Sequence, residues 1–299
     1  MTLIEMNSSF AIPGQLIFKE GAGSFPIAEI SNLHASAAVS LYGAHVLSYR
    51  PKGTQEVLWL SKTSKFESGK AIRGGIPICF PWFGPHPADP QKPAHGFARL
   101  LHWNVIKTFA LPGGETQLVL GLQSTETTWK LFPFDFSAEL VITVGEKLEV
   151  TLIVSNTGNA PFTLSGALHT YFDVSDIDNI TNDGLAGTEY YDGTQTDARK
   201  RQNESKLVIK QEENRRYMNT SNECIISDAA YERKIHAAKR GSSVTVVWNP
   251  GAETSKKLGD IHEGGYKTFV CIEAVNAYND IVTLAPNGHH SLSVILGVE

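Results

Sequence analysis

Two arginines and a histidine stand in one irregular segment of this sequence, between residues 72 and 99. Arg73 precedes a glycine pair and two prolines, while His95 and Arg99 belong to the run His95-Gly96-Phe97-Ala98-Arg99. Glycine allows unusual backbone conformations and proline fixes φ, so we expect a stiff loop with one shape. Any one of the three residues alone is explained as well by a surface charge or a structural histidine. Together, on a preorganised loop, they favour a binding site.

Two more residues have side chains suited to acid–base chemistry. His169 follows the apolar run 162–168, and its unperturbed pKa lies close to neutral pH, so it could act as a general acid or base. Glu273 interrupts the apolar run 268–275, where burial of an unpaired charge is costly. The alternatives are a core histidine bonded to backbone and a glutamate on the exposed face of a strand.

Asp228 and Trp248 are weaker candidates for contacts with a polar ligand. Asp228 ends a predicted strand and could accept a hydrogen bond from a hydroxyl group, but an aspartate that caps a turn explains it equally well. Trp248 precedes Asn249-Pro250-Gly251 and could stack on a sugar ring or pack in the core.

Metal and nucleophile motifs find little support in the remaining residues. His289 and His290 are adjacent and would point to opposite faces of a strand, and the other histidines lack the short spacing of zinc ligands. The three cysteines have no paired spacing, and no serine lies in a nucleophile elbow. The sequence therefore favours neither a metal site nor a serine hydrolase.

Composition excludes several classes of partner. The chain of 299 residues has a net charge of −5, which argues against nucleic acid as a partner, although local arginines could still bind a small anion. The sequence shows no signal peptide and no apolar run long enough to cross a membrane. With three sparse cysteines, a reducing and cytoplasmic location is the default expectation.

Period-two alternation of apolar residues dominates the chain. It is clearest in 136–144 and 148–154, which the turn 145–147 joins into a predicted hairpin. No strongly periodic helix is available to cover the apolar faces, so sheet must pack on sheet. We therefore predict an all-β protein, a large antiparallel β-sandwich with few short helices. Its other predicted strands are two runs within 37–49, then 57–60, 103–106, 117–120, 162–167, 223–226, 242–248, 268–274, 281–284 and 291–296.

The polar region 173–222 raises the question of a domain boundary. A linker is conceivable there, but strands continue on both sides and no second core starts afresh. We expect long exposed connections of one domain covering residues 1–299, with a short edge strand near Tyr190-Tyr191. A second long loop, 251–265, could hold a helical turn.

In combination and in order, these segments resemble the glucose-6-phosphate 1-epimerases, or hexose-6-phosphate mutarotases. This family is a branch of the galactose mutarotase-like (aldose 1-epimerase) superfamily. The resemblance spans nearly the whole chain and is carried by Arg73-Gly74-Gly75-Ile76-Pro77, Phe80-Pro81-Trp82-Phe83-Gly84, His95-Gly96-Phe97-Ala98-Arg99, His169-Thr170-Tyr171-Phe172, Asp228 with Tyr231, Trp248-Asn249-Pro250 and Val270-Cys271-Ile272-Glu273.

The resemblance implies a β-sandwich with an open cleft, no cofactor, and interconversion of the α and β anomers of a hexose 6-phosphate. It makes His169 the general acid and Glu273 the general base. The residues expected to hold the substrate are Arg73, Arg99 and Asp228, with His95 beside them. Ala94 departs from the family pattern, in which a glutamine often contacts the substrate, and this loosens the expected sugar preference.

Two other functions stay open at this point. One is a mutarotase of unphosphorylated aldoses, and the other is a β-sandwich that binds carbohydrate without turnover. In each case the expected partner is a small molecule and the expected protein is a monomer.

Overall fold

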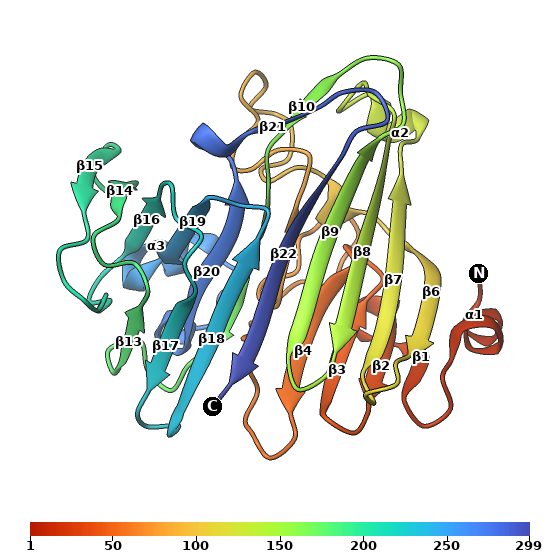
Figure 1. Ribbon diagram of the computed structural model, residues 1–299, viewed down its shortest axis with the longest axis horizontal. Helices are drawn as coiled ribbons and strands as arrows, with labels where there is room; N and C mark the ends of the chain where they lie inside the picture. Colours follow the sequence, from red (N-terminus) through yellow and green to blue (C-terminus); the bar gives the residue numbers. More distant parts are fainter.

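The computed structural model describes residues 1–299 and is built mainly of antiparallel strands, as predicted (Figure 1). One layer is an eight-stranded sheet, which we call the back sheet. Buried and more exposed positions alternate along its central strands, and these form the predicted hairpin. In order across the sheet, its strands are β13 (Ile180–Asp183), β17 (Cys224–Asp228), β18 (Arg233–Arg240), β22 (His289–Val298), β9 (Leu148–Asn156), β8 (Phe136–Val144), β7 (Thr116–Gln123) and β6 (Asn104–Ala110).

A second large sheet carries most of the candidate residues, and we call it the site sheet. It also has eight strands, and every pairing in it is antiparallel. In order, its strands are β15 (Ala198–Arg201), β14 (Glu189–Asp192), β16 (Glu213–Tyr217), β19 (Val244–Asn249), β20 (Phe269–Asn276), β11 (Gly166–Leu168) and β5 (Ile78–Cys79), with β12 (Tyr171–Asp173) also paired to β20.

Two smaller sheets complete the sandwich. In Figure 1 the strands β9 to β6 of the back sheet lie over the four-stranded sheet. Strand β4 of the four-stranded sheet also contacts the loop before β5, through a bridge between Val46 and Ile76. The remaining strands are β1 (Leu16–Glu20), β2 (Pro26–Ser31), β3 (Ala35–Ser40) and β4 (His45–Pro51) in that sheet, and β10 (Phe162–Leu164) paired with β21 (Val282–Leu284) in the other.

Helices are few and short, as predicted. The N-terminal helix α1, which the sequence analysis missed, begins with a capping box in which Thr2 and Glu5 bond reciprocally. No helix combines the length and the apolar character that a membrane crossing requires. The helical segments are α1 (Leu3–Phe10), α2 (Glu126–Trp129), α3 (Gly251–Leu258), and the 3-10 turns η1 (Ala22–Ser24), η2 (Ala98–Leu100), η3 (Gly265–Thr268) and η4 (Tyr278–Asp280).

Local differences from the predicted elements have simple causes. Residues 57–60 form isolated bridges at Leu58 and Leu60, not the expected strand, because each pairs with a different segment. The edge strand near Tyr190-Tyr191 is present as β14, but β13, β15 and β16 in the same polar region were missed. Their sequences, such as Glu213-Asn214-Arg215-Arg216-Tyr217, lack an apolar alternation. The helical turn in 251–265 is present as α3.

Strand β20 is buried on both faces, and this decides where the candidate site lies. Val270, Ile272 and Ala274 join the main hydrophobic cluster of 57 residues between the sheets. The alternate positions, which include Cys271 and Glu273, face the other side of the site sheet, which we call its outer face. Loops and aromatic side chains cover that face, so Glu273 is 2% exposed although it points away from the main core.

Candidate active site

His169 and Glu273, 104 positions apart in the chain, meet on the outer face of the site sheet. Their closest atoms, His169 Nε2 and Glu273 Oε1, are 3.4 Å apart. The segment between β11 and β12 carries His169 past β20, where the backbone amide of His169 donates to the carbonyl of Pro77. His169 Nδ1 and Glu273 Oε2 are buried without a partner in the protein, so each retains an atom for a ligand.

Burial shifts the pKa of both members of this pair towards the uncharged form. Loss of solvation raises the pKa of Glu273 well above its ordinary range. Loss of solvation also lowers the pKa of His169, and the nearby His95, Arg99 and Arg73 lower it further. A carboxyl and an imidazole with strongly shifted pKa values in contact are typical of a catalytic acid–base pair.

Arg73 belongs to a chain of polar contacts that ends beside His169. Its guanidinium donates to the hydroxyl of Tyr171 (Nη1 to Oη, 2.8 Å) and forms an ion pair with Asp260 (Nη2 to Oδ2, 3.1 Å). The Tyr171 ring stacks on the imidazole of His169, with ring centres 4.9 Å apart and planes at 10°. The neighbouring Trp248 meets the same imidazole edge-on at 6.0 Å. Arg73 is therefore held in a fixed place with part of its charge compensated.

His95 lies on the other side of His169, with ring centres 5.8 Å apart. The amide of Gly84 donates to His95 Nδ1 (3.3 Å), and the thiol of Cys79 lies 3.4 Å from the same atom. Burial, with the charges of Arg99 and Arg73, lowers the pKa of His95 to about 3. A neutral His95 that accepts at Nδ1 carries its proton on Nε2, so it can donate a hydrogen bond to a substrate.

Arg99 is the arginine of this group that has no carboxylate partner. Its Nη2 donates to the carbonyl of Ala94 (2.8 Å), its Nε is buried without a partner, and it forms no ion pair. The positive charge of Arg99 helps to lower the pKa of both His95 and His169. An uncompensated guanidinium beside the acid–base pair suits an anionic group of a ligand.

The glycines of the loop have a steric role at two positions. Gly75 has φ +61°, and a Cβ there would lie 2.2 Å from the carbonyl oxygen of Val46. Gly96, with φ +71°, is packed so closely that a Cβ would lie 2.0 Å from the carbonyl oxygen of Phe80. Residues with side chains would therefore displace the backbone that carries Arg73 and His95.

The structure does not bring Asp228 to this group. Asp228 ends β17 in the back sheet, where its carboxylate accepts hydrogen bonds from the backbone amides of Ser175 (2.8 Å) and Tyr231 (3.3 Å). Ser175 follows β12, whose Asp173 pairs with Phe269 at the far end of β20 from Glu273. These contacts are those of an aspartate that caps a turn, which was the alternative interpretation of Asp228.

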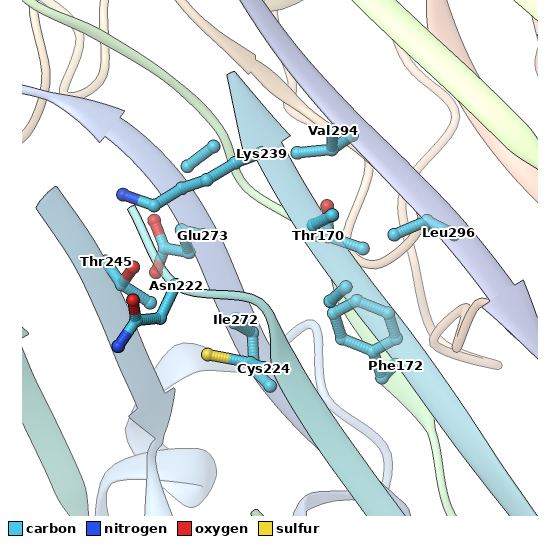
Figure 2. Close-up of a pocket in the computed structure, with 13 residues that line it drawn as sticks. Thr170, Phe172, Asn222, Cys224, Lys239, Thr245, Ile272, Glu273, Val294 and Leu296 are labelled. Carbon is cyan, nitrogen blue, oxygen red and sulfur yellow. The ribbon is translucent and has the colours of Figure 1, made fainter. Parts of the chain in front are cut away.

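Behind Glu273, between the two sheets, the protein leaves almost no space. Figure 2 shows the small cavity that lies there. Thr170, Thr245, Ile272 and Phe172 of β12 surround it, and Cys224 of the back sheet closes it. Its volume of about 10 Å³ is the space of about one water molecule. A substrate must therefore reach the pair from the outer face, where Arg73, Arg99 and His95 are each partly exposed.

Tyr171 and Asp260 are the residues of this site that sequence reasoning missed as functional. Tyr171 lies two positions from His169, but period-two alternation alone does not reveal its hydroxyl contact. Asp260 lies in the loop 259–264, and nothing in the sequence links that loop to Arg73. The structure contains no group of three or more His, Cys, Asp or Glu side chains arranged to hold a metal ion.

Comparison with known proteins gives a consistent family match. The family model described as aldose 1-epimerase matches residues 26–297. A Salmonella typhimurium protein that is provisionally named glucose-6-phosphate 1-epimerase is 35% identical over 277 residues, covering 91% of this chain and 92% of that protein. An Escherichia coli protein with the same provisional name is 37% identical over 248 residues, covering 83% and 82% of the two chains.

A solved structure shares the fold over nearly the whole chain. The crystal structure of a protein from Salmonella typhimurium, described provisionally as a mutarotase, superposes with a TM-score of 0.89. The two chains are 31% identical, and the alignment covers 99% of each. The predicted sandwich is thus confirmed by both the strand topology and the structural neighbour.

Proposed function

Because the chain belongs to the aldose 1-epimerase family, we propose that it is an isomerase that interconverts the α and β anomers of D-glucose 6-phosphate and related hexose 6-phosphates. The observation that carries this proposal is the contact between His169 and Glu273, buried among Arg73, Arg99 and His95. We also propose that residues 1–299 act as one domain, which the continuous hydrophobic cluster from Met6 to Leu296 supports.

The reaction needs one proton donor and one proton acceptor on the same sugar. Glu273 takes the proton from the C1 hydroxyl while His169 protonates the ring oxygen, and the C1–O5 bond breaks. Rotation about the C1–C2 bond presents the other face of the aldehyde. Return of both protons then closes the ring as the opposite anomer, and the pair ends as it began. The chemistry requires nothing beyond these two side chains and the groups that hold the sugar.

The pKa directions fit the state that the reaction passes through. When the ring is open, Glu273 holds the proton from C1 and His169 has given its proton away, so both groups are uncharged. Burial raises the pKa of Glu273 and lowers that of His169, so it favours this arrangement. A resting pair in the uncharged form therefore reaches the charged form that starts ring opening when one proton passes from Glu273 to His169 across the 3.4 Å contact. The site therefore lowers the free energy of the open-chain complex relative to the charged pair.

Arg99 is the better of the two arginines for the phosphate group. It has no carboxylate partner, whereas Arg73 is paired with Asp260. A guanidinium paired with a carboxylate offers donors and an acceptor together, which suits neutral sugar hydroxyls. We therefore propose that Arg99 binds the phosphate, with the N–H of His95 beside it, and that Arg73 and Asp260 hold hydroxyl groups. Asp228 has no part in this arrangement.

Exchange between anomers, measured by NMR at equilibrium, tests the proposal. We expect faster exchange of glucose 6-phosphate with the protein than in buffer, and the same experiment with galactose and mannose 6-phosphates ranks the substrates. Binding of glucose 6-phosphate without faster exchange would instead identify a carbohydrate-binding sandwich without turnover.

A mutarotase of free aldoses is the second candidate, and the Arg73–Asp260 pair favours it, because that pair leaves one side of the site without net charge. The two candidates separate when glucose and glucose 6-phosphate are compared in the same assay. A higher kcat/KM for free glucose than for glucose 6-phosphate would identify the unphosphorylated sugar as the substrate.

A further inference from the structure

Cys79 is a completely buried thiol beside the candidate site, and the proposed reaction gives it no step. It ends the two-residue strand β5, where it lies opposite Ala167 of β11. Ala167 in turn lies opposite Val275 of β20, two positions from Glu273. Side chains at directly paired positions point to the same face of a sheet, so the thiol of Cys79 points to the outer face, as Glu273 does.

The pairing of β5 with β11 also fixes Cys79 relative to the proposed general acid. Ile78 pairs with Leu168, and the next residue, His169, donates its backbone amide to the carbonyl of Pro77 (3.0 Å). Three consecutive positions of each segment are therefore joined by one ladder of backbone contacts. The thiol of Cys79 and the imidazole of His169 thus belong to one rigid part of the sheet.

His95 reaches this part of the sheet from a different segment. Its backbone amide donates to the carbonyl of Gly84 (2.7 Å), and the next residue, Gly96, forms a bridge with Phe80. His95 has φ +62°, a left-handed conformation that residues with side chains rarely adopt and that the surroundings must hold. These contacts fix the backbone of His95 but leave the orientation of its ring to side-chain contacts.

Cys79 supplies one of those side-chain contacts. Its Sγ lies 3.4 Å from Nδ1 of His95, within the range of a hydrogen bond to sulfur. The amide of Gly84 donates to the same nitrogen (3.3 Å), so Nδ1 carries no proton and the thiol is the second donor. Burial raises the pKa of Cys79 to about 12, so the thiol keeps the proton that it donates. The proton of the neutral ring therefore stays on Nε2.

The aromatic neighbours of His95 do not select its orientation. The ring of Phe83 meets the imidazole edge-on, with ring centres 5.0 Å apart, and the ring of His169 lies at 5.8 Å. A half-turn of the imidazole exchanges its nitrogens with carbons and leaves its shape unchanged, so packing alone distinguishes the two orientations poorly. The two donors at Nδ1 make the distinction, and they leave the N–H at Nε2 for a substrate.

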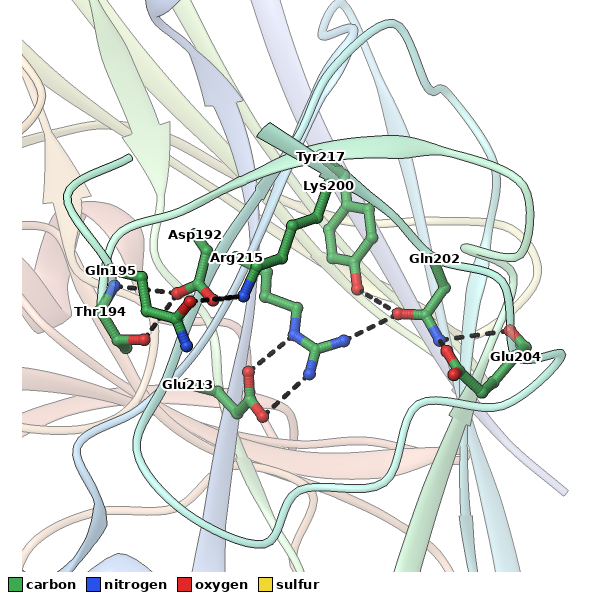
Figure 3. Close-up of polar contacts among 9 residues, drawn as sticks. All are labelled: Asp192, Thr194, Gln195, Lys200, Gln202, Glu204, Glu213, Arg215 and Tyr217. Atoms are coloured by element: carbon green, nitrogen blue, oxygen red, sulfur yellow. Dashed lines mark hydrogen bonds and ion pairs between the residues drawn. The ribbon is translucent and has the colours of Figure 1, made fainter. Parts of the chain in front are cut away.

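Another polar group of the site sheet is held differently. Figure 3 shows Arg215 bonded to Glu213 (2.7 Å) and Gln202 (2.8 Å), with Tyr217 also donating to Gln202. A charged pair with short hydrogen bonds of this kind keeps its place when one contact is lost. His95 has only two neutral donors at longer distances, so the loss of one should change its orientation measurably.

A thiol suits the position of Cys79 because the surroundings are apolar. Cys79 belongs to a cluster on the outer face that includes Ala167, Val244, Val246 and Val275. A thiol packs as a small apolar group and is also a weak donor, so it fills the cluster and contacts the imidazole at a low cost of desolvation. Packing and donation are separate properties, and substitutions can remove one without the other.

We propose that Cys79 is a positioning residue, which donates from its thiol to Nδ1 of His95 and thereby keeps the N–H at Nε2 directed to the sugar. This inference rests on the proposed function for the identity of that sugar, whereas the tautomer of His95 can be measured without it. Cys79 is completely buried, so its effect on the substrate passes through His95.

Nitrogen-15 NMR of labelled histidine side chains tests this role in the protein without ligand. The spectra report which ring nitrogen carries the proton, and the signals that His95→Gln removes are those of His95. We expect a single Nε2–H form in the wild type and an additional Nδ1–H form in Cys79→Ala. Cys79→Ser keeps a donor and should show the single form. Val244→Ala is the matched control, because it removes volume from the same cluster but no donor, and it should leave the spectrum of His95 unchanged.

Anomer exchange of glucose 6-phosphate on the same samples measures the effect on the substrate. Cys79→Ala should raise KM by about 3- to 10-fold and change kcat by less than about twofold, because a hydrogen bond to the bound sugar is weakened in every bound state. KM for Cys79→Ser and for Val244→Ala should stay within about twofold of the wild type. Thermal unfolding checks that each variant is folded.

The two measurements distinguish failure of this role from failure of the proposed function. A single Nε2–H form in Cys79→Ala overturns the role of Cys79, and so does an Nδ1–H form that also appears in Cys79→Ser or Val244→Ala. An Nδ1–H form in Cys79→Ala alone supports the role even where the wild type does not accelerate anomer exchange, and in that case the proposed function fails. An unchanged KM in Cys79→Ala, where the wild type does accelerate exchange, overturns the role.

Discussion

The β8–β9 hairpin of the back sheet and strand β20 of the site sheet differ in which of their residues are buried. In β8 and β9 every second residue is buried, and all of these are apolar except Asn156. All eight residues of β20 are buried, and Glu273 is among them. The hairpin maximises apolar burial on one face, while β20 gives up that pattern to hold a carboxyl group away from water.

The difference separates the residues that stabilise the fold from those that cost it stability. Leu140 and Leu152 of the hairpin remove apolar surface from water without burying a charge. Glu273 and His169 are buried with shifted pKa values and with one unpartnered polar atom each. Sites that bind or react commonly carry such a cost, which the rest of the core offsets. Substitutions in the two regions should therefore have opposite effects.

Of the comparisons between the two regions, the one with the largest expected effect is His169→Asn in the site sheet, which should change the rate. Loss of the group that protonates the ring oxygen should reduce anomer exchange of glucose 6-phosphate by about 10²- to 10⁴-fold. Anomer exchange measured by NMR at equal concentrations of variant and wild type gives this rate, and thermal unfolding checks that the variant is folded. A rate within about twofold of the wild type would remove His169 from the mechanism.

Leu140→Ala in the hairpin should show the reverse behaviour. Leu140 is completely buried in the main cluster, so the cavity should reduce the free energy of unfolding by about 2–5 kcal/mol. Exchange per folded molecule should not change, since Leu140 lies in the back sheet, where it pairs with Leu120 and Leu152. Denaturant unfolding and the exchange assay on the same sample test this prediction. A large loss of activity per folded molecule would contradict the claim that the hairpin affects stability and not the reaction.

Arg99→Ala tests the division within the site sheet itself. Removal of the guanidinium that has no carboxylate partner should raise KM for glucose 6-phosphate by about 10- to 100-fold and change KM for free glucose by less than about threefold. Equal changes in KM for the two sugars would mean that Arg99 binds hydroxyl groups and that Arg73 binds the phosphate.

The smallest effect is a difference in the pH dependence of stability between wild type and Glu273→Gln. The folded pKa of Glu273 is raised, so the folded protein keeps a proton that the unfolded chain loses as pH rises past its ordinary value. This carboxyl group therefore lowers the free energy of unfolding as pH rises, by at most about 1.4 kcal/mol per pH unit. Glu273→Gln should gain relative stability between about pH 5 and pH 7 in urea unfolding. A constant difference would mean that Glu273 is ionised in the fold.

The sequence was most informative where one rule decides the structure. Period-two alternation predicted the β8–β9 hairpin, and a carboxylate inside an apolar run singled out Glu273. It was least informative where partners are distant in the chain. Arg73 and Asp260 are 187 positions apart and meet only because the loop after α3 folds over the outer face. Asp228 illustrates the same limit, since a local motif could not tell the back sheet from the site sheet.

Anomer exchange of glucose 6-phosphate by Glu273→Gln, compared with the wild type at equal concentration, tests the central claim most directly. The amide is nearly the same size as the carboxyl group but cannot take the C1 proton. We predict a folded variant, at least as stable as the wild type at neutral pH, with exchange no faster than in buffer. Exchange at the wild-type rate in the folded variant would contradict the account.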